Sequence, residues 1–559
     1  MRKLFTYLGA LLPSRNDYRF ARQHWRGDLF AGITVGIVAL PLALAFGVSS
    51  GVGAEVGLIT AVIAGIVAAI FGGSNVQISG PTGAMVVVLG PIVVQYGVTT
   101  VALLSIMAGV IVLIGGVLKL GRVVGYVPWP VIEGFTLGIA VIIFLQQVPA
   151  AIGTSPGPSE NALLAAIESF TLAEWAHPER VLWPIGIVIV VACIMVFAPR
   201  LHPQLPGSII AIILVATTVY LARIPMETIG ALPSALPAPQ LPLVNLDLLI
   251  ALAGPACTVA ALAAIESLLS ARVAAGLADT GPYDADRELV GQGLASIAVG
   301  FFGGMPATGA IARTAVNIRA GGRTRIASIV HSLVLLAVVY LASTVVSEIP
   351  LAALSGVLMV TAFRMVSVAT VRTLVGSTRS DTFIFFLTAV ITVSFDLIIA
   401  VGIGIAVAAF FALRKLSAAS GVAREELPGA AQLGDERIAL FRLDGSLFFG
   451  AADRILEQVL ENTSVSVVII RMSQIQIMDA TGGNVVTEMI RGLNRRGITV
   501  LVKGIQEQHL RLLTRVGVVR KLQDEHHLFD NLDEAVAHAR ALIRAEREEQ
   551  GDEQLDIGI

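Results

Sequence analysis

Residues 28–416 form a near-continuous series of long apolar runs, and this feature constrains the fold more than any other. Of the 559 residues, 55% are hydrophobic and 14% are charged, whereas an ordinary soluble domain has about 25% charged residues. The chain becomes mixed and charge-rich only after Arg424. The sequence therefore predicts a mostly α-helical membrane domain followed by a soluble domain.

Fourteen segments of the apolar region are candidate membrane-spanning helices, since a span needs roughly 20 apolar residues. They fall into two sets in chain order. The first set covers residues 28–48, 54–72, 81–96, 99–119, 124–147, 181–199 and 205–222. The second set covers residues 247–271, 287–303, 308–319, 324–343, 350–365, 380–396 and 398–415.

Positive charges test this assignment, because cytoplasmic connections carry an excess of lysine and arginine. The N-terminal segment, residues 1–27, is basic, and the odd-numbered connections carry only Arg180 and Arg223. The even-numbered connections and the span ends beside them carry Lys119, Arg122, Arg200, Arg272, Arg287, Arg319, Arg323, Arg325, Arg364, Arg372 and Arg379. Both termini are therefore predicted to be cytoplasmic.

Two short stretches of the chain resemble each other. Phe71-Gly72-Gly73 with Ser79-Gly80-Pro81-Thr82-Gly83 has a counterpart in Phe302-Gly303-Gly304 with Pro306-Ala307-Thr308-Gly309. Each interrupts an apolar run with glycine and proline and precedes a short apolar segment. Because each half has an odd number of spans, the sequence predicts a 7+7 inverted repeat, an arrangement found in many secondary carriers.

The two interruptions predict an anion-binding site. A helix N-terminus offers unpaired N–H groups and a partial positive charge of about half a unit. Two such ends, at residues 81–96 and 308–319, would face each other near the membrane midplane and hold an anion. Ser79 and Thr308 are the candidate capping residues. Gly83 and Gly309 would let the ligand approach the backbone; the alternative is that they only permit close helix packing.

Two charged side chains within the apolar segments are functional candidates, because intramembrane charges are costly. Arg313 would add positive potential for an anion or would pair structurally with Glu266. Glu266 would carry a proton or ligate Na⁺, with Ser270 on the same helix face four residues later. The alternative is a permanently ionised Glu–Arg pair with a structural role.

Other function classes lack support in the sequence. No histidine has ligand spacing with acids or cysteines, no Walker-type phosphate loop is present, and no basic tract suggests nucleic acid. The sequence thus predicts a protein that is not an enzyme and has no metal centre or cofactor.

The C-terminal part alternates short apolar runs with helical patterns, which is typical of a small α/β sheet. Strands are predicted at Ile438–Leu443, Val465–Ile470 and Ile498–Val502. Helices are predicted at Ala452–Glu461 and Gly482–Arg495. The predicted divisions are a polar linker at 417–436, the α/β domain at 437–545 and a polar tail at 546–559.

These residues resemble the SulP family of sulfate permease-type anion transporters along nearly the whole chain. The similar motifs are Gly32–Pro41, Ile78–Thr82, Glu288–Gly293 and Asn317–Gly322, and the C-terminal domain is similar to a STAS domain with its signature loop at Met478–Gly482. The resemblance implies fourteen helices divided into core and gate subdomains, usually in a homodimer, that move a small anion by an elevator-like motion.

The resemblance also implies the site residues. The substrate would lie between Thr82, Gly83 and Ala84 on one side and Gly309, Ala310 and Ile311 on the other, with Phe46 of the first helix nearby. The acidic coupling position would be Glu266. Members that use Na⁺ tend to have an aspartate there and a hydroxyl residue near Ile311. The glutamate and isoleucine of this chain favour H⁺ as the coupling ion.

We therefore expect a secondary transporter of the bacterial inner membrane that imports bicarbonate, sulfate or a C4-dicarboxylate with H⁺. A cytoplasmic regulator would act at the STAS domain. Two alternatives stay open: a Na⁺-coupled bicarbonate symporter with Na⁺ at Glu266, and an anion-sensing signalling protein that acts through its STAS domain.

Overall fold

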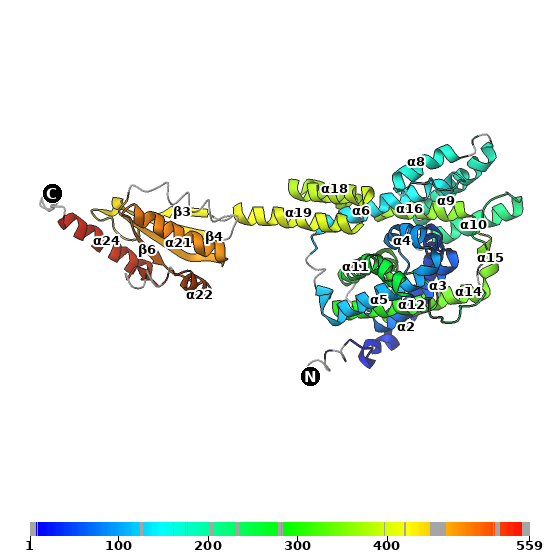
Figure 1. The fold of residues 1–559 in the computed structure, drawn as a ribbon. Helices are drawn as coiled ribbons and strands as arrows, with labels where there is room; N and C mark the ends of the chain where they lie inside the picture. The colour runs from blue at the N-terminus through cyan, green and yellow to red at the C-terminus, as the bar shows by residue number, and fades with distance from the viewer. Residues whose placement is uncertain are drawn as a thin grey trace. The chain divides into compact units, whose positions relative to one another are not determined.

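The computed structural model divides into two compact units, residues 1–406 and 407–559 (Figure 1). It describes residues 7, 9, 11–122, 127–159, 161–173, 175, 177–201, 205–230, 232, 234–277, 281, 283–395, 397–418, 421–447, 465–517, 519, 522 and 526–549. The first unit is mostly helical with one two-stranded pairing, and the second contains a five-stranded β-sheet.

A helix occupies each of the segments for which the sequence predicts a span. The first set is α2 (Ala21–Ser49), α3 (Ala54–Phe71), α4 (Gly83–Tyr96), α5 (Val101–Val117), α6 (Trp129–Gln146), α9 (Pro178–Leu201) and α10 (Gly207–Ala222). The second set is α11 (Leu246–Leu277), α12 (Ala285–Phe301), α13 (Ile311–Arg319), α14 (Arg325–Leu341), α16 (Leu351–Met365), α18 (Arg379–Ser394) and α19 (Leu397–Ala418). Short helices not predicted as spans are α7 (Val148–Ala151), α8 (Ala162–Leu172), α15 (Ser343–Ser347) and α17 (Val368–Gly376).

Length and hydropathy support a multi-pass membrane protein. Among the described residues, eight helices are long and apolar enough to cross a membrane. Helices α4, α8, α10 and α14 are apolar but shorter. The two shortest helices of the predicted spans are α4 and α13, and each follows one of the Gly- and Pro-containing interruptions.

The helices of the first unit pack in two groups. One group contains α2, α3, α5, α11, α12, α13 and α14, and the other contains α6, α9, α10, α16 and α18. The same contacts recur when each helix is replaced by its counterpart in the other set. Helix α14 packs on α2 and α3, and its counterpart α5 packs on their counterparts α11 and α12. In the second group, α6 packs on α18, and their counterparts α16 and α9 also pack on each other.

Glycines allow α12 to approach its neighbours at backbone distance. A Cβ atom at Gly291 would lie 2.4 Å from the backbone nitrogen of Gly72 at the end of α3. A Cβ atom at Gly293 would lie 2.6 Å from the backbone nitrogen of Leu113 in α5. Small residues are the usual means of close helix packing in membranes. These contacts make α12 the shared support of α3 and α5.

The N-terminal segment is held against the first unit by an ion pair. Asp17, in the 3₁₀ helix η1 (Arg15–Tyr18), accepts two hydrogen bonds from the Arg287 guanidinium, at 3.0 and 2.7 Å. Burial acts to raise the pKa of Asp17, but the hydrogen bonds from Arg287 and from the N–H of Ser14 outweigh it and lower the pKa to about 2. The ionised carboxylate therefore stabilises the folded state.

The second unit contains a five-stranded sheet in the order β3-β4-β5-β6-β7. The strands are β3 (Gly421–Glu425), β4 (Ile438–Leu447), β5 (Val467–Met478), β6 (Thr499–Lys503) and β7 (Leu528–Phe529). Strand β3 is antiparallel to β4, and the remaining pairs are parallel. Alternate residues of the central strands face α21 (Ala480–Arg495) with α22 (Glu507–Val516) on one side and α24 (Leu532–Glu549) on the other.

Most predictions for this domain are confirmed, with one correction. The predicted strands correspond to β4, β5 and β6, and the helix predicted at Gly482–Arg495 corresponds to α21. The stretch 417–436, expected to be only a linker, contains β3, because Glu425 at its end forms ion pairs with Arg442 and Arg471 of the sheet. The helix predicted at Ala452–Glu461 lies outside the described residues.

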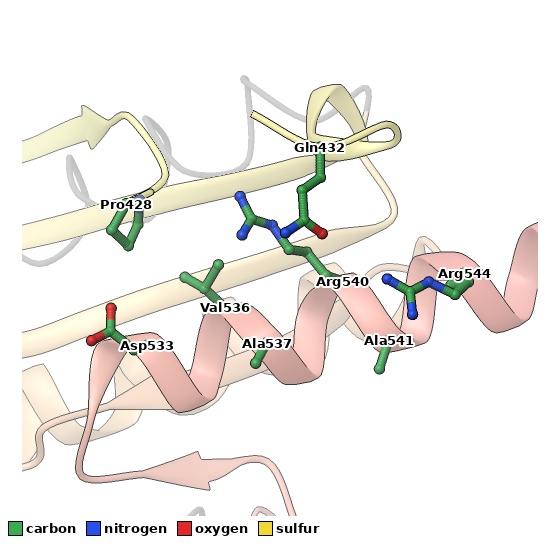
Figure 2. Close-up of a pocket in the computed structure, with 8 residues that line it drawn as sticks. All are labelled: Pro428, Gln432, Asp533, Val536, Ala537, Arg540, Ala541 and Arg544. Carbon is green, nitrogen blue, oxygen red and sulfur yellow. The ribbon is translucent and has the colours of Figure 1, made fainter. Parts of the chain in front are cut away.

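A groove of about 330 Å³ lies in this domain between the segment of Pro428 and Gln432 and helix α24 (Figure 2). Hydrogen bonds from Arg540 lower the pKa of Asp435 and fix that guanidinium at one wall. Arg544, one helical turn further on, also lines the groove. The groove thus presents two guanidinium groups and the carboxylate of Asp533 beside apolar side chains.

We expect Gly291→Ala to lower stability by about 1–3 kcal/mol, because its Cβ would meet the backbone of Gly72. The measurement is the thermal unfolding midpoint of the purified protein in detergent. Gly254→Ala in α11 is the matched control, since a Cβ there would meet nothing within 4 Å. Equal midpoints for the two variants would contradict the close approach of α12 to α3.

We expect Asp17→Asn to cost about 2 kcal/mol of unfolding free energy at pH 7. Because the pKa of Asp17 is lower in the folded than in the unfolded protein, its carboxylate stabilises the folded state at pH values above the unfolded pKa near 4. This stabilisation is lost as the pH falls toward 2. The difference between wild type and variant should therefore shrink between pH 4 and pH 2 in denaturation experiments. The exposed Asp247→Asn serves as control, and a pH-independent difference would argue against the ion pair as its cause.

Candidate functional site

Two short strands cross where the interrupted helices begin. Strand β1 (Ser79–Gly80) pairs antiparallel with β2 (Thr308–Gly309), with Ser79 opposite Gly309 and Gly80 opposite Thr308. The N–H of Ala310 donates to the carbonyl of Ile78 at 2.8 Å, which extends the pairing. The structure thus brings together two stretches that lie more than 200 residues apart in the chain.

The two helices begin directly after the crossing. Helix α4 starts at Gly83 with Thr82 as N-cap, and α13 starts at Ile311 with Ala310 as N-cap. The expected starts at residues 81 and 308 are therefore early, because residues 79–80 and 308–309 are in the strand pair. Neither N-cap makes a side-chain capping hydrogen bond. The first N–H groups of both helices have no intrahelical acceptor.

The residues expected to cap these helices form hydrogen bonds with other helices instead. Ser79 is in β1, and its hydroxyl accepts a hydrogen bond from the Gln292 side chain at 2.6 Å. Thr308 is in β2, and its hydroxyl donates to Glu266 Oε2 at 2.7 Å. The sequence prediction of capping is wrong at both positions, since each hydroxyl bonds to another helix of the fold rather than to its own.

Glu266 of α11 connects the two crossing stretches. Its Oε2 accepts one hydrogen bond from Thr82 Oγ1 at 2.8 Å and one from Thr308 Oγ1 at 2.7 Å. The two hydroxyl oxygens lie 3.1 Å apart. The next residue of the helix, Ser267, accepts the N–H of Gly309 with its Oγ at 3.0 Å. Helix α11 therefore holds both stretches through two consecutive side chains, Glu266 and Ser267.

Arg313 is buried behind the crossing, with 2% of its surface exposed. Its Nη2 donates to the carbonyl of Pro81, just before α4. Among the described residues no ion pair joins it to Glu266 and its Nη1 has no hydrogen-bond partner. Charge–charge attraction nevertheless acts between the two side chains. The guanidinium lies within α13 and contacts the start of α4, so its charge adds to both helix N-termini.

The remaining predicted residues surround the crossing at different distances. Ala84, Ala310 and Phe46 are buried, whereas Ile311 is 37% exposed. Ser270 is buried, and its hydroxyl lies 3.3 Å from that of Thr314 rather than against Glu266. The structure therefore places Ser267, not Ser270, beside the crossing strands on α11.

The two glycines of the predicted site accommodate protein side chains. A Cβ atom at Gly83 would lie 2.3 Å from Ile143 Cδ1 and 3.5 Å from Phe46 Cε1. A Cβ atom at Gly309 would lie 1.7 Å from the side-chain nitrogen of Gln77. Close packing, the alternative considered for these glycines, thus explains why neither position carries a side chain.

Several supporting residues were not predicted from the sequence. Glu288 of α12, which is 2% exposed, accepts the N–H groups of Gly73 and Ser74 at 2.8 and 3.0 Å. Gln292 joins Glu288 to Ser79 by donating to both. Their spacing of four residues places both on one face of α12. That pattern could have indicated a shared partner, but nothing in the sequence identifies it as the loop before β1.

Polar atoms without partners concentrate near the crossing. Within the described part of the chain, the buried side-chain amide of Gln77 makes no hydrogen bond, and Arg313 Nη1 makes none. A buried polar group without a partner costs roughly 1–3 kcal/mol. Water or a polar ligand is the usual partner in such a place. No group of three or more potential metal-ligating side chains is present among the described residues.

These features define a class of protein: a multi-pass membrane protein built around two interrupted helices that meet inside it. The chain matches the Sulfate permease family over residues 25–388 and the STAS domain over residues 432–535. Because the first match spans more than half of its length, this chain belongs to the Sulfate permease family. It is an anion transporter of that family and not an enzyme.

Individual relatives agree with this assignment. The chain is 37% identical over 523 residues to "Putative sulfate transporter YvdB" of Bacillus subtilis, a match that covers 92% of this chain and 97% of the relative. It is 30% identical over 538 residues to the "Bicarbonate transporter BicA" of Synechocystis sp., covering 92% and 94%.

Two solved structures are similar to this one. The transmembrane domain of a cyanobacterial bicarbonate transporter BicA has a TM-score of 0.61 and 32% identity, covering 68% of this chain and 98% of that chain. A structure of SLC26A9 has a TM-score of 0.80, covering 98% and 95%, and at 16% identity it shows the shared fold alone.

We expect Glu288→Gln to lower stability by about 1–3 kcal/mol, because an amide cannot replace both carboxylate oxygens as acceptors. Thermal unfolding in detergent would measure the loss. The exposed Glu55→Gln, in the first turn of α3, is the matched control. If Glu288→Gln unfolds like wild type, Glu288 does not hold the loop before β1.

Proposed function

We propose that this chain is a secondary active transporter that imports a small anion together with H⁺. The observation that carries the proposal is the meeting of two uncapped helix N-termini at one carboxylate, Glu266. The helix ends provide N–H donors and positive potential for the anion. The carboxylate, in the same place, provides a group that can take up the coupling ion.

The anion would bind between the first N–H groups of α4 and those of α13. We assign Thr82, Gly83 and Ala84 to one side and Gly309, Ala310 and Ile311 to the other, with Phe46 as the neighbouring aromatic wall. Arg313 would raise the local positive potential from behind the strands. The partly exposed Ile311 and the partly exposed Glu266 favour entry from that side.

H⁺ is favoured over Na⁺ by the hydrogen bonds at Glu266. Both hydroxyls approach Oε2 at 2.7 and 2.8 Å, ordinary distances for a direct O–H···O⁻ contact. A metal ion would have to separate these oxygens, whereas a proton fits among them. The residue at the start of α13 is Ile311, which offers no side-chain oxygen. Ser270, the other predicted coupling residue, would act only through the hydroxyl of Thr314.

The transport motion would be of the elevator type. The recurring helix contacts, with the two sets exchanged, support a 7+7 inverted repeat with fourteen spans. The group of α2, α3, α5 and α11–α14, together with α4, would be the mobile core. The group of α6, α9, α10, α16 and α18 would be the gate, and we assign α19 to it by position in the repeat. We propose a bacterial inner-membrane location, and the distribution of lysine and arginine supports cytoplasmic termini.

The donors of the proposed site and the names of the relatives restrict the anion to a class, the small oxyanions. Backbone N–H groups can donate hydrogen bonds to any small oxyanion, so sulfate, bicarbonate and C4-dicarboxylates all fit the proposed site. Relatives are named sulfate and bicarbonate transporters. The similarity to the bicarbonate transporter BicA supports Na⁺–bicarbonate symport as the second candidate, and uptake in Na⁺-free buffer separates the two.

The C-terminal domain would regulate this transport. The groove between Gln432 and α24, with Arg540 and Arg544, offers a surface for a cytoplasmic regulator (Figure 2). Homodimerisation is a further proposal that rests on the family resemblance. An anion-sensing signalling role is distinguished by deleting residues after Leu416: a carrier still binds its anion, whereas a sensor loses its output.

The proposal predicts the behaviour of Glu266→Gln in proteoliposomes. Wild-type uptake of radiolabelled sulfate, bicarbonate or succinate should rise when the outside is made acidic. The variant, which holds no exchangeable proton at residue 266, should lose this gradient-driven uptake and keep exchange at equal pH. Glu133→Gln in α6 is the control, since Glu133 bonds to Trp129 at the helix start. Full gradient-driven uptake by Glu266→Gln would refute the coupling role.

A further inference from the structure

The hydroxyl of Thr82 occupies an unusual position for a helix N-cap. Threonine at an N-cap normally accepts a hydrogen bond from an N–H of the first helical turn. In α4 no such bond forms, and the hydroxyl instead donates to Glu266 Oε2 at 2.8 Å. The side chain is 5% exposed. One buried hydroxyl thus lies between the carboxylate and the proposed anion site.

The carboxylate controls where this hydroxyl points. An ionised carboxylate accepts charge-assisted hydrogen bonds, which are about twice as strong as neutral ones. It therefore holds the single hydroxyl proton of Thr82, and a hydroxyl has only one proton to donate. Glu266 Oε1 accepts no hydrogen bond from the described residues, so a proton can add there.

From this geometry we infer that Thr82 is a proton-dependent donor, whose hydroxyl turns from Glu266 to the bound anion when Glu266 is protonated. The inference rests on the proposed function and specifies how the two ions are linked. Protonation makes the carboxyl group neutral and weakens its hold on the hydroxyl. The Thr82 hydroxyl then joins the N–H groups at the starts of α4 and α13 as a further donor to the anion. No covalent bond changes except that of the added proton.

Thr308 has a different role in this arrangement. Its hydroxyl donates to the same oxygen, but it lies in β2, two residues before the N-cap of α13. Even when released, it is not at a helix N-terminus. Thr308 is therefore a positioning residue that keeps Glu266 against the crossing strands. Arg313 is the charged side chain that acts electrostatically on Glu266, and its Nη2 donates to the carbonyl of Pro81.

The consequence is cooperative binding of proton and anion. The protonated site has one more donor for the anion and one fewer negative charge beside it. By linkage, the anion favours protonation as much as the proton favours the anion. Anion affinity should therefore rise as pH falls. Part of this rise comes from the lost charge of Glu266 and part from the hydroxyl of Thr82.

The test is equilibrium binding of radiolabelled sulfate to the purified full-length protein at pH 6 and pH 8, where sulfate keeps its charge. Bicarbonate, nitrate and fumarate compete as further probes. Wild type should bind more tightly at pH 6. Thr82→Val, which removes the hydroxyl at nearly constant shape, should reduce the affinity ratio between the two pH values by about ten-fold. Thr82→Ser should restore it.

Matched variants separate this linkage from general damage to the site. Thr308→Val removes the other hydroxyl on Glu266 Oε2 but leaves that of Thr82 in place, so it should keep the tighter binding at pH 6 that Thr82→Val loses. Thr388→Val in α18 is a buried control whose hydroxyl bonds only to its own helix, at Ile384. A thermal unfolding midpoint for each variant verifies that the protein is folded.

The outcomes distinguish the inference from the proposed function. If Thr82→Val keeps the wild-type ratio while Glu266→Gln abolishes it, coupling is through charge alone and the switch of Thr82 is wrong. If Thr82→Ser behaves like Thr82→Val, the hydroxyl is not responsible. If wild type shows no pH dependence, H⁺ coupling itself fails, and if none of the four anions binds, the anion site fails.

Discussion

The antiparallel pairing of β1 with β2 is the constraint on which the rest of the membrane unit depends. Non-helical backbone cannot be exposed to lipid, because its N–H and C=O groups would lack partners. Here each stretch supplies partners for the other, and side chains of neighbouring helices supply the remainder: Thr314 accepts the N–H of Ile78, and Ser328 donates to the carbonyl of Gln77. The pairing brings two helix N-termini to one point, and Glu266 meets them there.

Close backbone packing gives this crossing a firm support. Helix α12 approaches the end of α3 at Gly72 and approaches α5 near Leu113, and both contacts exclude any side chain at the facing glycine. The same helix carries Glu288 and Gln292, which hold the loop and the strand before α4. A chain of contacts thus runs from rigid helix packing to the position of the N-cap Thr82. A displacement of α12 would therefore move residues of the proposed anion site.

The helices and the doubled interruption could be predicted because they depend on local properties of the sequence. Apolar runs and glycine–proline breaks are visible without any knowledge of tertiary contacts. The start of each short helix depends on tertiary contacts: Ser79 and Thr308 have side chains suited to capping, yet strand pairing takes both residues out of the helix. Likewise Gly309 indicated space for a ligand, whereas the amide of Gln77 fills that space. In the soluble unit, the polar composition around Gly421–Glu425 concealed an edge strand held by ion pairs.

By itself, the sequence determined the approximate limits of many apolar helices, the two unusual interruptions and the isolated carboxylate at Glu266, because each is a property of neighbouring residues. Only the tertiary structure decided which side chains meet. It placed Thr82 and Thr308 on one oxygen of Glu266, turned Arg313 to the carbonyl of Pro81, and put Glu288 under the loop before β1. These partners are separated by 42 to 232 residues along the chain, and no local pattern records contacts at such separations. They exist because burial in a helical membrane unit leaves each polar group to be satisfied by whatever the fold brings beside it.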